Sequence, residues 1–406
     1  MDPVRQIQNF NAGREQERLQ LKYRKMRENS FVFLRGSCHL FYCRLPRSGV
    51  FRSAPPVWSC GDLHIENFGS YKGDNRLSYF DTNDYDEAAL APASWDLVRV
   101  LCSLWVAADC GALGGARVSD AKALAETLLS AYASSLAQGK AYWLERDTAQ
   151  GPVKTLLDAL RSRERSEFLN ERTKPGKQRQ LRIDKVKTLD VTRAQREQVQ
   201  DFMKGFAREQ PEPAFYKLLD VARRIAGTGS LGVERYVLLV NGKGSPDGNY
   251  LLDLKRSLPS SLLPHLRVAQ PRWSNEAQRI VTLQQRMQAI PMALLHPVTM
   301  DKHSWVLREL QPTQDRVALD KLGRGSKNVE QLVTALGRLI AWAQLRSAGR
   351  QGSATADELI DFGQRTRWQA KLLEAARDCA KQVERDARAF NEAYDDGGFN
   401  PSGRKR

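Results

Sequence analysis

The stretch CGDLHIENFG, residues 60–69, places an aspartate, a histidine, a glutamate and an asparagine between two glycines. A loop of this composition can hold a metal ion with carboxylate and amide oxygens while an aspartate receives the proton of a reacting hydroxyl. It can also be a polar turn. Asp62 and Asn67 are five positions apart, an interval that occurs by chance in many chains. Other parts of the chain therefore have to decide between the two hypotheses.

A cluster of carboxylates follows further along the chain. The segment RLSYFDTND, residues 76–84, has the composition of a strand, and carboxylates gather at its end: Asp81, Asp84, Asp86 and Glu87. Like charges this close repel one another, and a divalent cation offsets the repulsion. Because Mg²⁺ prefers a few carboxylate and amide oxygens, we expect Asn67 with Asp81 or Asp84 to bind it. An acidic turn without a metal is the alternative.

A glycine-rich segment, GTGSLG at residues 227–232, precedes the apolar run ERYVLLV and the turn sequence NGKGSPDG. Dinucleotide-binding loops lead into a helix, whereas the phosphate loop of kinases joins two strands. The run after GTGSLG favours two strands and a hairpin. The residues expected to cover nucleotide phosphates are Gly227, Thr228, Gly229, Ser230 and Gly232. Lys255, on the next strand, would hold the phosphates, unless it is a solvated strand lysine.

The chain divides into parts of different composition, which together predict an α+β fold. Residues 1–53 are expected to hold a polar helix and then, in 31–45, a strand or buried segment. Residues 54–206 carry the acidic motifs and buried or basic helices. A glycine-containing β-rich part, 207–315, contains a helix near its middle, and 316–406 supplies further helices and a tail.

Composition and charge limit the function classes. No apolar run is long enough to span a membrane and no apolar signal segment is present, so we expect a cytoplasmic location without membrane contact. The six cysteines lack metal-ligand spacing, which excludes a zinc cluster or disulfide framework. The net charge of +16 is concentrated in part in residues 161–200, which contain a single aromatic residue. This segment is either a solvated basic face or a surface for a polyanion or nucleic acid.

The motifs together resemble the protein-kinase-like phosphotransferases. In the aminoglycoside and choline kinase branch, H-G-D-x-H-x-x-N is followed by I-D-F/W-x-x and by a helix beginning D-L-A. The counterparts here are CGDLHIEN, FDTNDYDE and WDLVRVL, with Asp96 in the last. More narrowly, these motifs with FLRG at 33–36 and GTGSLG resemble the bacterial family called domain of unknown function 2252. The resemblance covers most of the chain and implies a two-lobed kinase-like fold that uses ATP and Mg²⁺.

The chain departs from the kinase pattern in order and in detail. The glycine-rich segment and Lys255 come after Asp62, whereas kinases have them before the catalytic loop, so the resemblance implies a circular permutation. Cys60 stands where kinases have histidine. In the helix expected at 275–288, the glutamate that would pair with Lys255 is not obvious, because Glu276 lies early in the helix.

The leading prediction is an ATP- and Mg²⁺-dependent phosphotransferase acting on a hydroxyl of a small molecule or protein. The resemblance implies that Asp62 orients and deprotonates that hydroxyl and that Asn67 helps to hold the metal. The alternatives are an AMP transferase on the same fold, with the nucleotide reversed, or a nucleotide-dependent or nucleic-acid-binding scaffold. The two enzyme hypotheses require Asp62 and Lys255 to face one another across one cleft.

Overall fold

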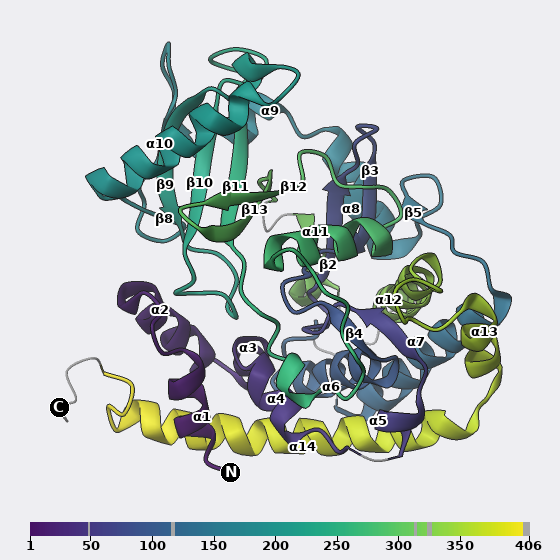
Figure 1. Ribbon diagram of the computed structural model, residues 1–406. Coiled ribbons are helices and arrows are strands. Elements are labelled where there is room, and N and C mark those ends of the chain that lie inside the picture. The colour runs from purple at the N-terminus through teal and green to yellow at the C-terminus, as the bar shows by residue number, and fades with distance from the viewer. Residues whose placement is uncertain (48, 115–117, 312–314, 323–326, 401–406) are drawn as a thin grey trace.

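The computed structural model describes residues 1–47, 49–114, 118–311, 315–322 and 327–400. Within them the chain forms a mixed α+β fold, as expected, in which helices surround several antiparallel sheets. In Figure 1 the largest sheet stands at the upper left, and many of the helices gather below it and to its right. The long C-terminal helix α14 (Arg367–Asp395), in yellow, runs along the bottom of this view.

Short helices form the N-terminal segment. They are α1 (Pro3–Phe10), α2 (Gln16–Met26), α3 (Ser30–Gly36), α4 (Cys38–Arg44) and α5 (Val50–Ser53). The strand expected in 31–45 is wrong, because this stretch forms α3 and α4, although it is largely buried as the alternative required. Asn29 begins α3 by accepting a hydrogen bond from the Val32 N–H at 2.9 Å. The run is mostly apolar and aromatic, and its few polar residues do not mark the helical period that would distinguish a helix from a strand.

Small antiparallel sheets frame residues 60–67, here called the Asp62 loop, and residues 83–88, here called the acidic loop. The strands are β1 (Pro56–Ser59), β2 (Phe68–Lys72), β3 (Ser78–Thr82), β4 (Ala89–Pro92) and β5 (Leu144–Glu145). β1 pairs with β4, so Ser59 lies opposite Ala89, and β2 pairs with β3, so Phe68 lies opposite Thr82. Each loop joins the same two ladders, which brings the Asp62 loop and the acidic loop side by side.

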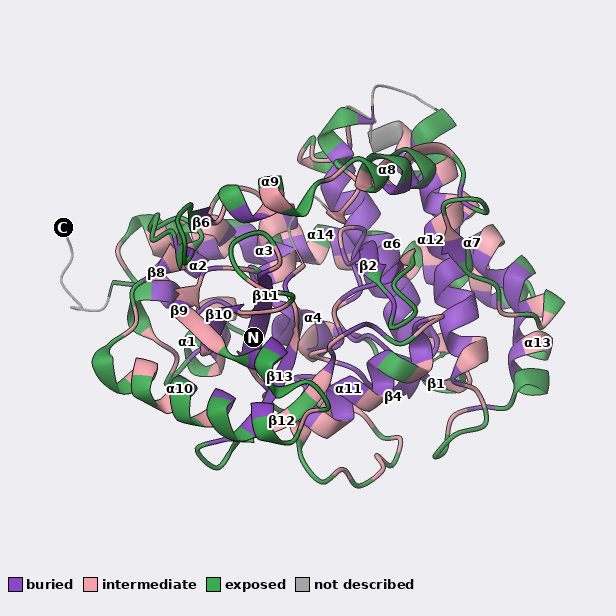
Figure 2. Ribbon diagram, turned by 90° about the horizontal axis from the view of Figure 1, so that it is seen from above, coloured by how far each residue is buried: buried purple, intermediate pink, exposed green. Residues whose placement is uncertain are grey.

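A body of packed helices lies behind these loops. It contains α6 (Ser94–Asp109), α7 (Val118–Gln138), α8 (Gly151–Arg161), α12 (Lys327–Arg346) and α13 (Ala356–Gln364), together with α14. α6 packs against α7 and α14, and α7 against α12 and α13. Figure 2 shows α6 and much of α7 and α12 in the purple of buried residues, whereas the exposed green dominates on α8. The helices expected from residue 94, at 329–346 and at 366–394 are therefore confirmed.

The largest sheet has the strand order β12-β13-β11-β10-β9-β8 and is antiparallel throughout its described pairs. The strands are β8 (Thr188–Leu189), β9 (Leu218–Arg224), β10 (Arg235–Val240), β11 (Tyr250–Arg256), β12 (His296–Met300) and β13 (His303–Glu309). Leu238 packs under α10 (Arg193–Arg208), while Val237 and Leu239 pack on the opposite face with Leu169 of α9 (Arg165–Asn170). This two-residue alternation is that of a strand covered on both faces.

The expected strand–turn–strand at 227–257 is confirmed by the pairing of β10 with β11, and the expected helix at 275–288 by α11 (Glu276–Met287). The basic segment up to about residue 205 is less helical than predicted. Between α9 and α10 it forms the short strands β6 (Thr173–Lys174), β7 (Gln180–Leu181) and β8. Pro175 and Gly176 follow β6 and favour a turn over a helix. Among the described residues, no helix has the length and apolar character needed to cross a membrane.

Candidate active site

A cleft lies between the largest sheet and the Asp62 loop, and it is lined by residues from distant parts of the chain. From the Asp62 side come Asp62, Asn67 and Asp84. From the sheet side come Lys255 and residues 227–232, here called the glycine loop, through Gly227, Thr228, Gly229 and Ser230. The fold thus brings together most of the residues that the sequence singled out. Asp81 and Gly232 lie outside the lining of the cleft.

One face of α6 holds the backbone of the Asp62 loop. The Asp96 carboxylate accepts hydrogen bonds from the N–H groups of Cys60, at 2.8 Å, and Gly61, at 2.9 Å. Two helical turns further on, the Ser103 hydroxyl accepts a hydrogen bond from the Ile65 N–H at 3.1 Å. Asp96 and Ser103 lie on the same face of the helix because they are seven residues apart. The start and the middle of the loop are therefore fixed to a buried helix.

Arg99, on the same face of α6, orients the Asp62 carboxylate. Its Nε donates to Asp62 Oδ1 at 2.8 Å, and its Nη2 donates to the same oxygen and to the Leu34 carbonyl. Arg99 is fully buried, whereas the side chain of Asp62 keeps 16% exposure at the cleft. Burial raises the pKa of Asp62 to about 6, and the charge of Arg99 opposes that rise. Asp62 is thus a positioned carboxylate with a pKa close to neutral pH, which suits a general base.

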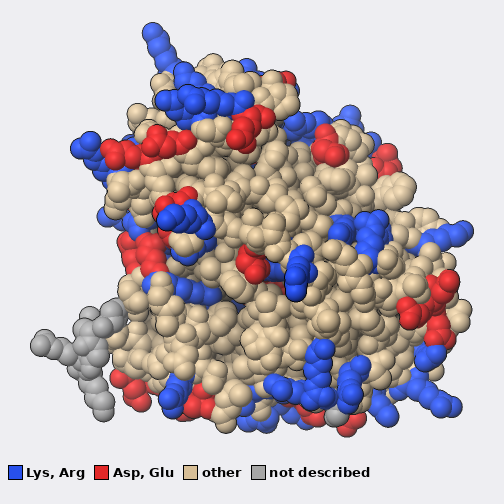
Figure 3. All heavy atoms as spheres, viewed as in Figure 1, with Lys and Arg blue, Asp and Glu red and all other residues tan. Residues whose placement is uncertain are grey.

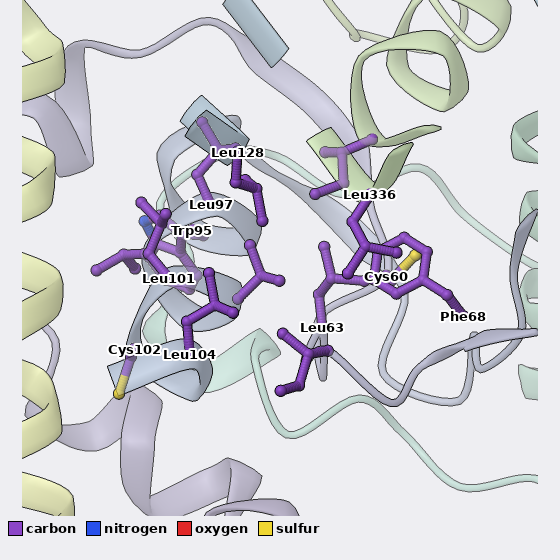
Figure 4. Packing of buried hydrophobic residues seen from close by; sticks show 14 of the residues in the cluster. Cys60, Leu63, Phe68, Trp95, Leu97, Leu101, Cys102, Leu104, Leu128 and Leu336 are labelled. Carbon is purple, nitrogen blue, oxygen red and sulfur yellow. The ribbon is translucent and has the colours of Figure 1, made fainter. Parts of the chain in front are cut away.

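Gly61 allows the Asp62 loop to approach the acidic loop. Its φ of +82° lies in the left-handed region, and a Cβ at this position would overlap the Glu87 backbone. Behind the loop, Cys60 and Leu63 belong to the main hydrophobic core, as do Leu97 and Leu101 of α6 (Figure 4). The side of the Asp62 loop away from the cleft is therefore packed in the core, and only its polar side faces the cleft.

Asn67 and His64 have different tasks in the loop. The Asn67 Nδ2 donates to the Asp62 carbonyl, which leaves Oδ1 as the amide atom that can serve as a ligand. The His64 Nδ1 accepts a hydrogen bond from the Glu66 N–H at 3.2 Å, and burial lowers the pKa of His64, so the ring is neutral. Glu66 in turn forms an ion pair with Arg35 of α3 at 2.5 Å. His64 therefore stabilises the loop as a hydrogen-bond acceptor.

Asp81 and Asp84, which the sequence left as alternatives, lie in different surroundings. Asp81 is 1% exposed and forms an ion pair with Arg346 of α12 at 2.8 Å, and its backbone neighbour Thr82 donates an N–H to it at 2.9 Å. Asp84 lines the cleft at the start of the acidic loop and is partly exposed. Asp81 is thus used in packing α12 against β3, whereas Asp84 is available to a ligand in the cleft.

Lys255 on β11 forms an ion pair with Asp86 of the acidic loop. Burial lowers the pKa of Lys255 to about 8. α11 supports this pair indirectly, because Arg279 donates to the Asp86 carbonyl at 2.9 Å and to the Ala88 carbonyl at 2.5 Å. Glu276 is engaged by Arg279 at 2.6 Å. The carboxylate beside Lys255 therefore comes from the loop after β3 and not from the helix that follows the lysine strand.

The glycine loop passes directly over Asp62. A Cβ on Gly229 would lie 3.8 Å from Asp62 Oδ2 and 3.1 Å from the Arg35 carbonyl, so only glycine brings the backbone this close without displacing a neighbour. Gly227 has a φ of +71°, which also favours glycine. On the outer side, Gly232 accepts a hydrogen bond from the Glu15 N–H at 3.0 Å. The loop is thus held between the N-terminal segment and the cleft.

The strands beside the glycine loop carry a charged cluster. Asp253 of β11 is 1% exposed and is contacted by Arg235 Nε at 2.7 Å, Arg224 Nη1 at 2.9 Å and Arg308 Nε at 3.5 Å. The arginines hold the pKa of Asp253 far below its usual range, although burial opposes them. One carboxylate does not neutralise these guanidinium groups, so the cluster carries excess positive charge.

Sequence analysis missed several residues of the site. Arg99 carries no motif of its own, although its position three residues after Asp96 places it on the same helix face. Arg35 lies inside the FLRG motif and lines the cleft with Arg14 and Arg316, but no fixed spacing links the three arginines to the Asp62 loop. No local pattern brings these arginines together, so only the tertiary structure identifies them.

Comparison with known proteins gives a family but no characterised relative. None of the curated proteins and none of the solved structures compared with the chain matches it. Residues 14–393 match the family described as "Uncharacterized protein conserved in bacteria (DUF2252)". The matched range includes the Asp62 loop, the acidic loop, the glycine loop and Lys255. Since it covers nearly the whole sequence, the chain belongs to the DUF2252 family.

Proposed function

We propose that the protein is an ATP- and Mg²⁺-dependent phosphotransferase that moves the γ-phosphoryl group to a hydroxyl of a small molecule or protein. The observation that carries the proposal is the shared cleft of Asp62 and Lys255, with the glycine loop passing over Asp62. A carboxylate for the acceptor hydroxyl, a backbone loop for phosphates and a lysine on a nearby strand are the parts that phosphoryl transfer on the kinase fold requires.

The strand order supports a kinase-like lobe around the glycine loop. β9, the glycine loop, β10 and β11 follow one another as neighbouring antiparallel strands, and Lys255 lies on β11, the third strand of this series. α11 comes next and packs against β12 and β13. In protein kinases the lysine lies on the third strand and a helix follows it. We propose that the largest sheet, with α9 and α10 packed on its two faces and α11 following its lysine strand, forms this lobe. The helices α6, α7, α12, α13 and α14 would belong to the other lobe, so the boundary expected at residue 206 would lie earlier in the chain.

In this proposal the chain is circularly permuted. The glycine loop follows the Asp62 loop in sequence, whereas the kinase order is the reverse. A site between two bodies depends on how they pack and not on which is synthesised first, and chain breaks are tolerated at exposed connections. The changed order is therefore compatible with the same chemistry.

The cleft has the charges that a nucleoside triphosphate needs. Arg14, Arg35 and Arg316 line it together with Lys255, and the Nε of Arg35 is buried without a hydrogen-bond partner among the described residues. Leaving a buried charged donor unpaired is costly, so a phosphate oxygen would stabilise it. The glycine loop adds backbone N–H groups.

Oxygen ligands for Mg²⁺ would come from Asp84 and Asn67 Oδ1. Among the described residues, no group of three or more His, Cys, Asp and Glu side chains is arranged to hold a metal by itself. Mg²⁺ commonly takes only one or two carboxylates and completes its shell with water and substrate phosphates. When bound, the ion neutralises charge on the phosphate oxygens. Asp81 is a poorer candidate because Arg346 already neutralises it.

In the reaction, Asp62 holds the acceptor hydroxyl through Oδ2 and takes its proton as the hydroxyl oxygen bonds to the γ-phosphorus. The bond from that phosphorus to the β,γ-bridging oxygen breaks, and ADP leaves. Arg99 keeps the Asp62 carboxylate in place and ionised. Lys255 holds the phosphate chain of the donor while Asp86 fixes the lysine.

The test is transfer of label from ATP in the presence of Mg²⁺ to a panel of hydroxyl acceptors and to the protein itself. Label from [γ-³²P]ATP should appear in a product, and label from [α-³²P]ATP should remain in ADP. Absence of any ATP-dependent stabilisation in a thermal-shift assay at millimolar ATP would contradict the proposal, because a ligand of the folded state raises its stability.

The second candidate is an AMP transferase, which the charged cluster around Asp253 favours. An adenine ring usually lies in an apolar slot, but Arg224, Arg235 and Arg308 surround Asp253 on the strands of the largest sheet, although none of the three lines the cleft itself. Excess positive charge there would suit the terminal phosphates of a reversed nucleotide. The acceptor oxygen would then attack the α-phosphorus and pyrophosphate would leave. In the labelling experiment, the α-label and not the γ-label would then enter the product.

A further inference from the structure

Lys22 of α2 is a fully buried lysine without a carboxylate beside it. Its Nζ donates to the Gly229 carbonyl at 2.8 Å and to Asn11 Oδ1 at 3.0 Å, both uncharged oxygens. Its exposure is 0%, and among the described residues no acidic group lies within ion-pair distance of it. Burying an ammonium group without an opposite charge is expensive. The lysine therefore needs an explanation beyond the packing of α2.

Arg14, in the turn between α1 and α2, reaches the same place. Its Nη1 donates to the Gly229 carbonyl at 2.9 Å and to the Leu231 carbonyl at 3.3 Å. A Cβ on Gly232 would come within 2.9 Å of the Arg14 Cβ, so the glycine makes room for this side chain. Lys22 and Arg14 thus both donate to one carbonyl of the glycine loop, and Arg14 also lines the cleft.

Holding this carbonyl sets the direction of the next N–H. In a trans peptide the C=O and N–H bonds point in opposite directions, so the N–H of Ser230 points away from Lys22 and Arg14. Gly229 and Ser230 both line the cleft, and no described residue accepts a hydrogen bond from this N–H. A backbone donor without a partner among the described residues, in a peptide that lines the cleft beside Lys22 and Arg14, is suited to an anionic oxygen.

We propose that Lys22 and Arg14 are positioning residues that turn the Gly229–Ser230 peptide so that the Ser230 N–H binds a phosphate of the donor. This inference rests on the proposed function and names a part of its site that lies outside the known motifs. It explains why a lysine is buried beside uncharged acceptors: its Nζ holds the carbonyl of the peptide that contacts the phosphate. The N-terminal segment is then part of the phosphate site.

The experiment compares the wild type with Lys22→Met, Arg14→Gln and Arg24→Met. Arg24 is exposed on the same helix and serves as the matched control. Hydrogen–deuterium exchange of the peptide covering 226–234 should be faster in Lys22→Met and Arg14→Gln and unchanged in Arg24→Met. By calorimetry, both inorganic triphosphate and ATP·Mg²⁺ should bind these two variants roughly 10- to 100-fold more weakly, since each loses a charged hydrogen bond to the loop. Adenosine should bind all four proteins equally.

The outcomes separate this inference from the proposed function. If triphosphate binding and loop exchange are the same in Lys22→Met, Arg14→Gln and the wild type, the inference is overturned even where ATP is turned over. If the wild type binds inorganic triphosphate more tightly than Lys22→Met but transfers no group from ATP, the phosphate site is supported and the proposed transferase activity is contradicted. Should Lys22→Met fail to fold, the exchange of residues 226–234 in Arg14→Gln decides the matter, because Arg14 is only partly buried. Weaker phosphate binding alone would not decide it, since Arg14 also lines the cleft.

Discussion

The Asp62 loop and the glycine loop face each other across the cleft, but they are held in different ways. The Asp62 loop is fixed by α6, whose Asp96 is 36 positions from Cys60. The glycine loop is fixed by Lys22, which is 207 positions from Gly229. One half of the site is therefore built by neighbouring segments of the chain, and the other half depends on a contact between distant segments.

The difference teaches which half of such a site a sequence can reveal. The local half leaves a motif, because loop and supporting helix keep a fixed spacing. The half that depends on contacts between distant segments contributes single residues, such as Lys22, whose partners cannot be recognised in the sequence. The two halves would also have different tasks. The Asp62 side would govern the chemical step, and the glycine loop, held by hydrogen bonds from Lys22 and Arg14, would govern binding of the phosphate donor. Four predictions test this division, beginning with the largest effect.

Asp62→Asn should reduce the rate of transfer by roughly 10³-fold, because the amide keeps the shape of the side chain but cannot accept the proton. Binding of ATP·Mg²⁺, measured by calorimetry, should remain within a few-fold of the wild type. Asp74→Asn, an exposed aspartate near the turn between β2 and β3, is the control and should leave both quantities unchanged. Equal turnover by Asp62→Asn and the wild type would remove Asp62 from the mechanism.

Asp84→Asn and Asp81→Asn should have different defects, one in Mg²⁺ binding and the other in stability. Loss of the Asp84 carboxylate should raise the Mg²⁺ concentration needed for half-maximal activity about tenfold or more, with little change in stability. Loss of the Asp81 carboxylate leaves Arg346 without its buried partner, so the free energy of unfolding should fall by about 3 kcal/mol. Urea denaturation and a Mg²⁺ titration of activity measure the two effects. The assignment is reversed if Asp81→Asn carries the metal defect.

On the opposite side of the cleft, Asp86→Asn should weaken ATP binding roughly tenfold, because Lys255 loses the carboxylate that fixes its ammonium. Glu276→Gln is the matched control, since Glu276 pairs with Arg279 and not with Lys255. Calorimetric dissociation constants for both variants provide the measurement. If Glu276→Gln is the more harmful change, a helix glutamate and not Asp86 supports the lysine.

The dependence of kcat/KM on pH should be bell-shaped. Asp62 must be ionised to accept a proton, and burial raises its pKa to about 6, so activity should fall as the pH decreases through about 6. Lys255 must be protonated to hold phosphate, and burial lowers its pKa to about 8, so activity should fall as the pH increases through about 8. A profile that is flat from pH 5 to pH 9 would show that neither group titrates in the catalytic step.

Much of the architecture could be predicted from the sequence, because it leaves periodic or turn-forming patterns. The apolar stripe of α12 and the Asn-Gly and Asp-Gly turn between β10 and β11 are of this kind. The segment 31–45 could not be assigned, because it is largely buried and its few polar residues do not mark the period of a helix. The short strands between α9 and α10 were missed because each pairs for only two residues.

The candidate site was predictable where a motif is local. Asp62, Asn67, the glycine loop and Lys255 are named from local motifs, whereas the sequence left Asp81 and Asp84 as alternatives. The choice between these two depends on Arg346, which is 265 positions from Asp81. Asp86 as the partner of Lys255 is likewise a contact between distant segments.

The composition of the chain also does not show where its charged side chains lie or which of them are paired. On the face shown in Figure 3, lysine and arginine side chains are interspersed with aspartate and glutamate. Within 161–200, Arg163, Arg179 and Arg196 form ion pairs with Asp315, Asp247 and Asp220. These pairs reduce the charge available to a polyanion, so the solvated basic face is the simpler interpretation of this segment.

The central claim is that the two halves of the cleft form one nucleotide site. The most direct measurement is calorimetric titration of ATP·Mg²⁺ into the wild type, Asp62→Asn and Lys255→Met. Saturable one-to-one binding to the wild type, similar binding to Asp62→Asn and binding weakened by roughly 10- to 100-fold in Lys255→Met are the expected results. No binding to the wild type, or equal affinity for Lys255→Met and the wild type, would contradict the account.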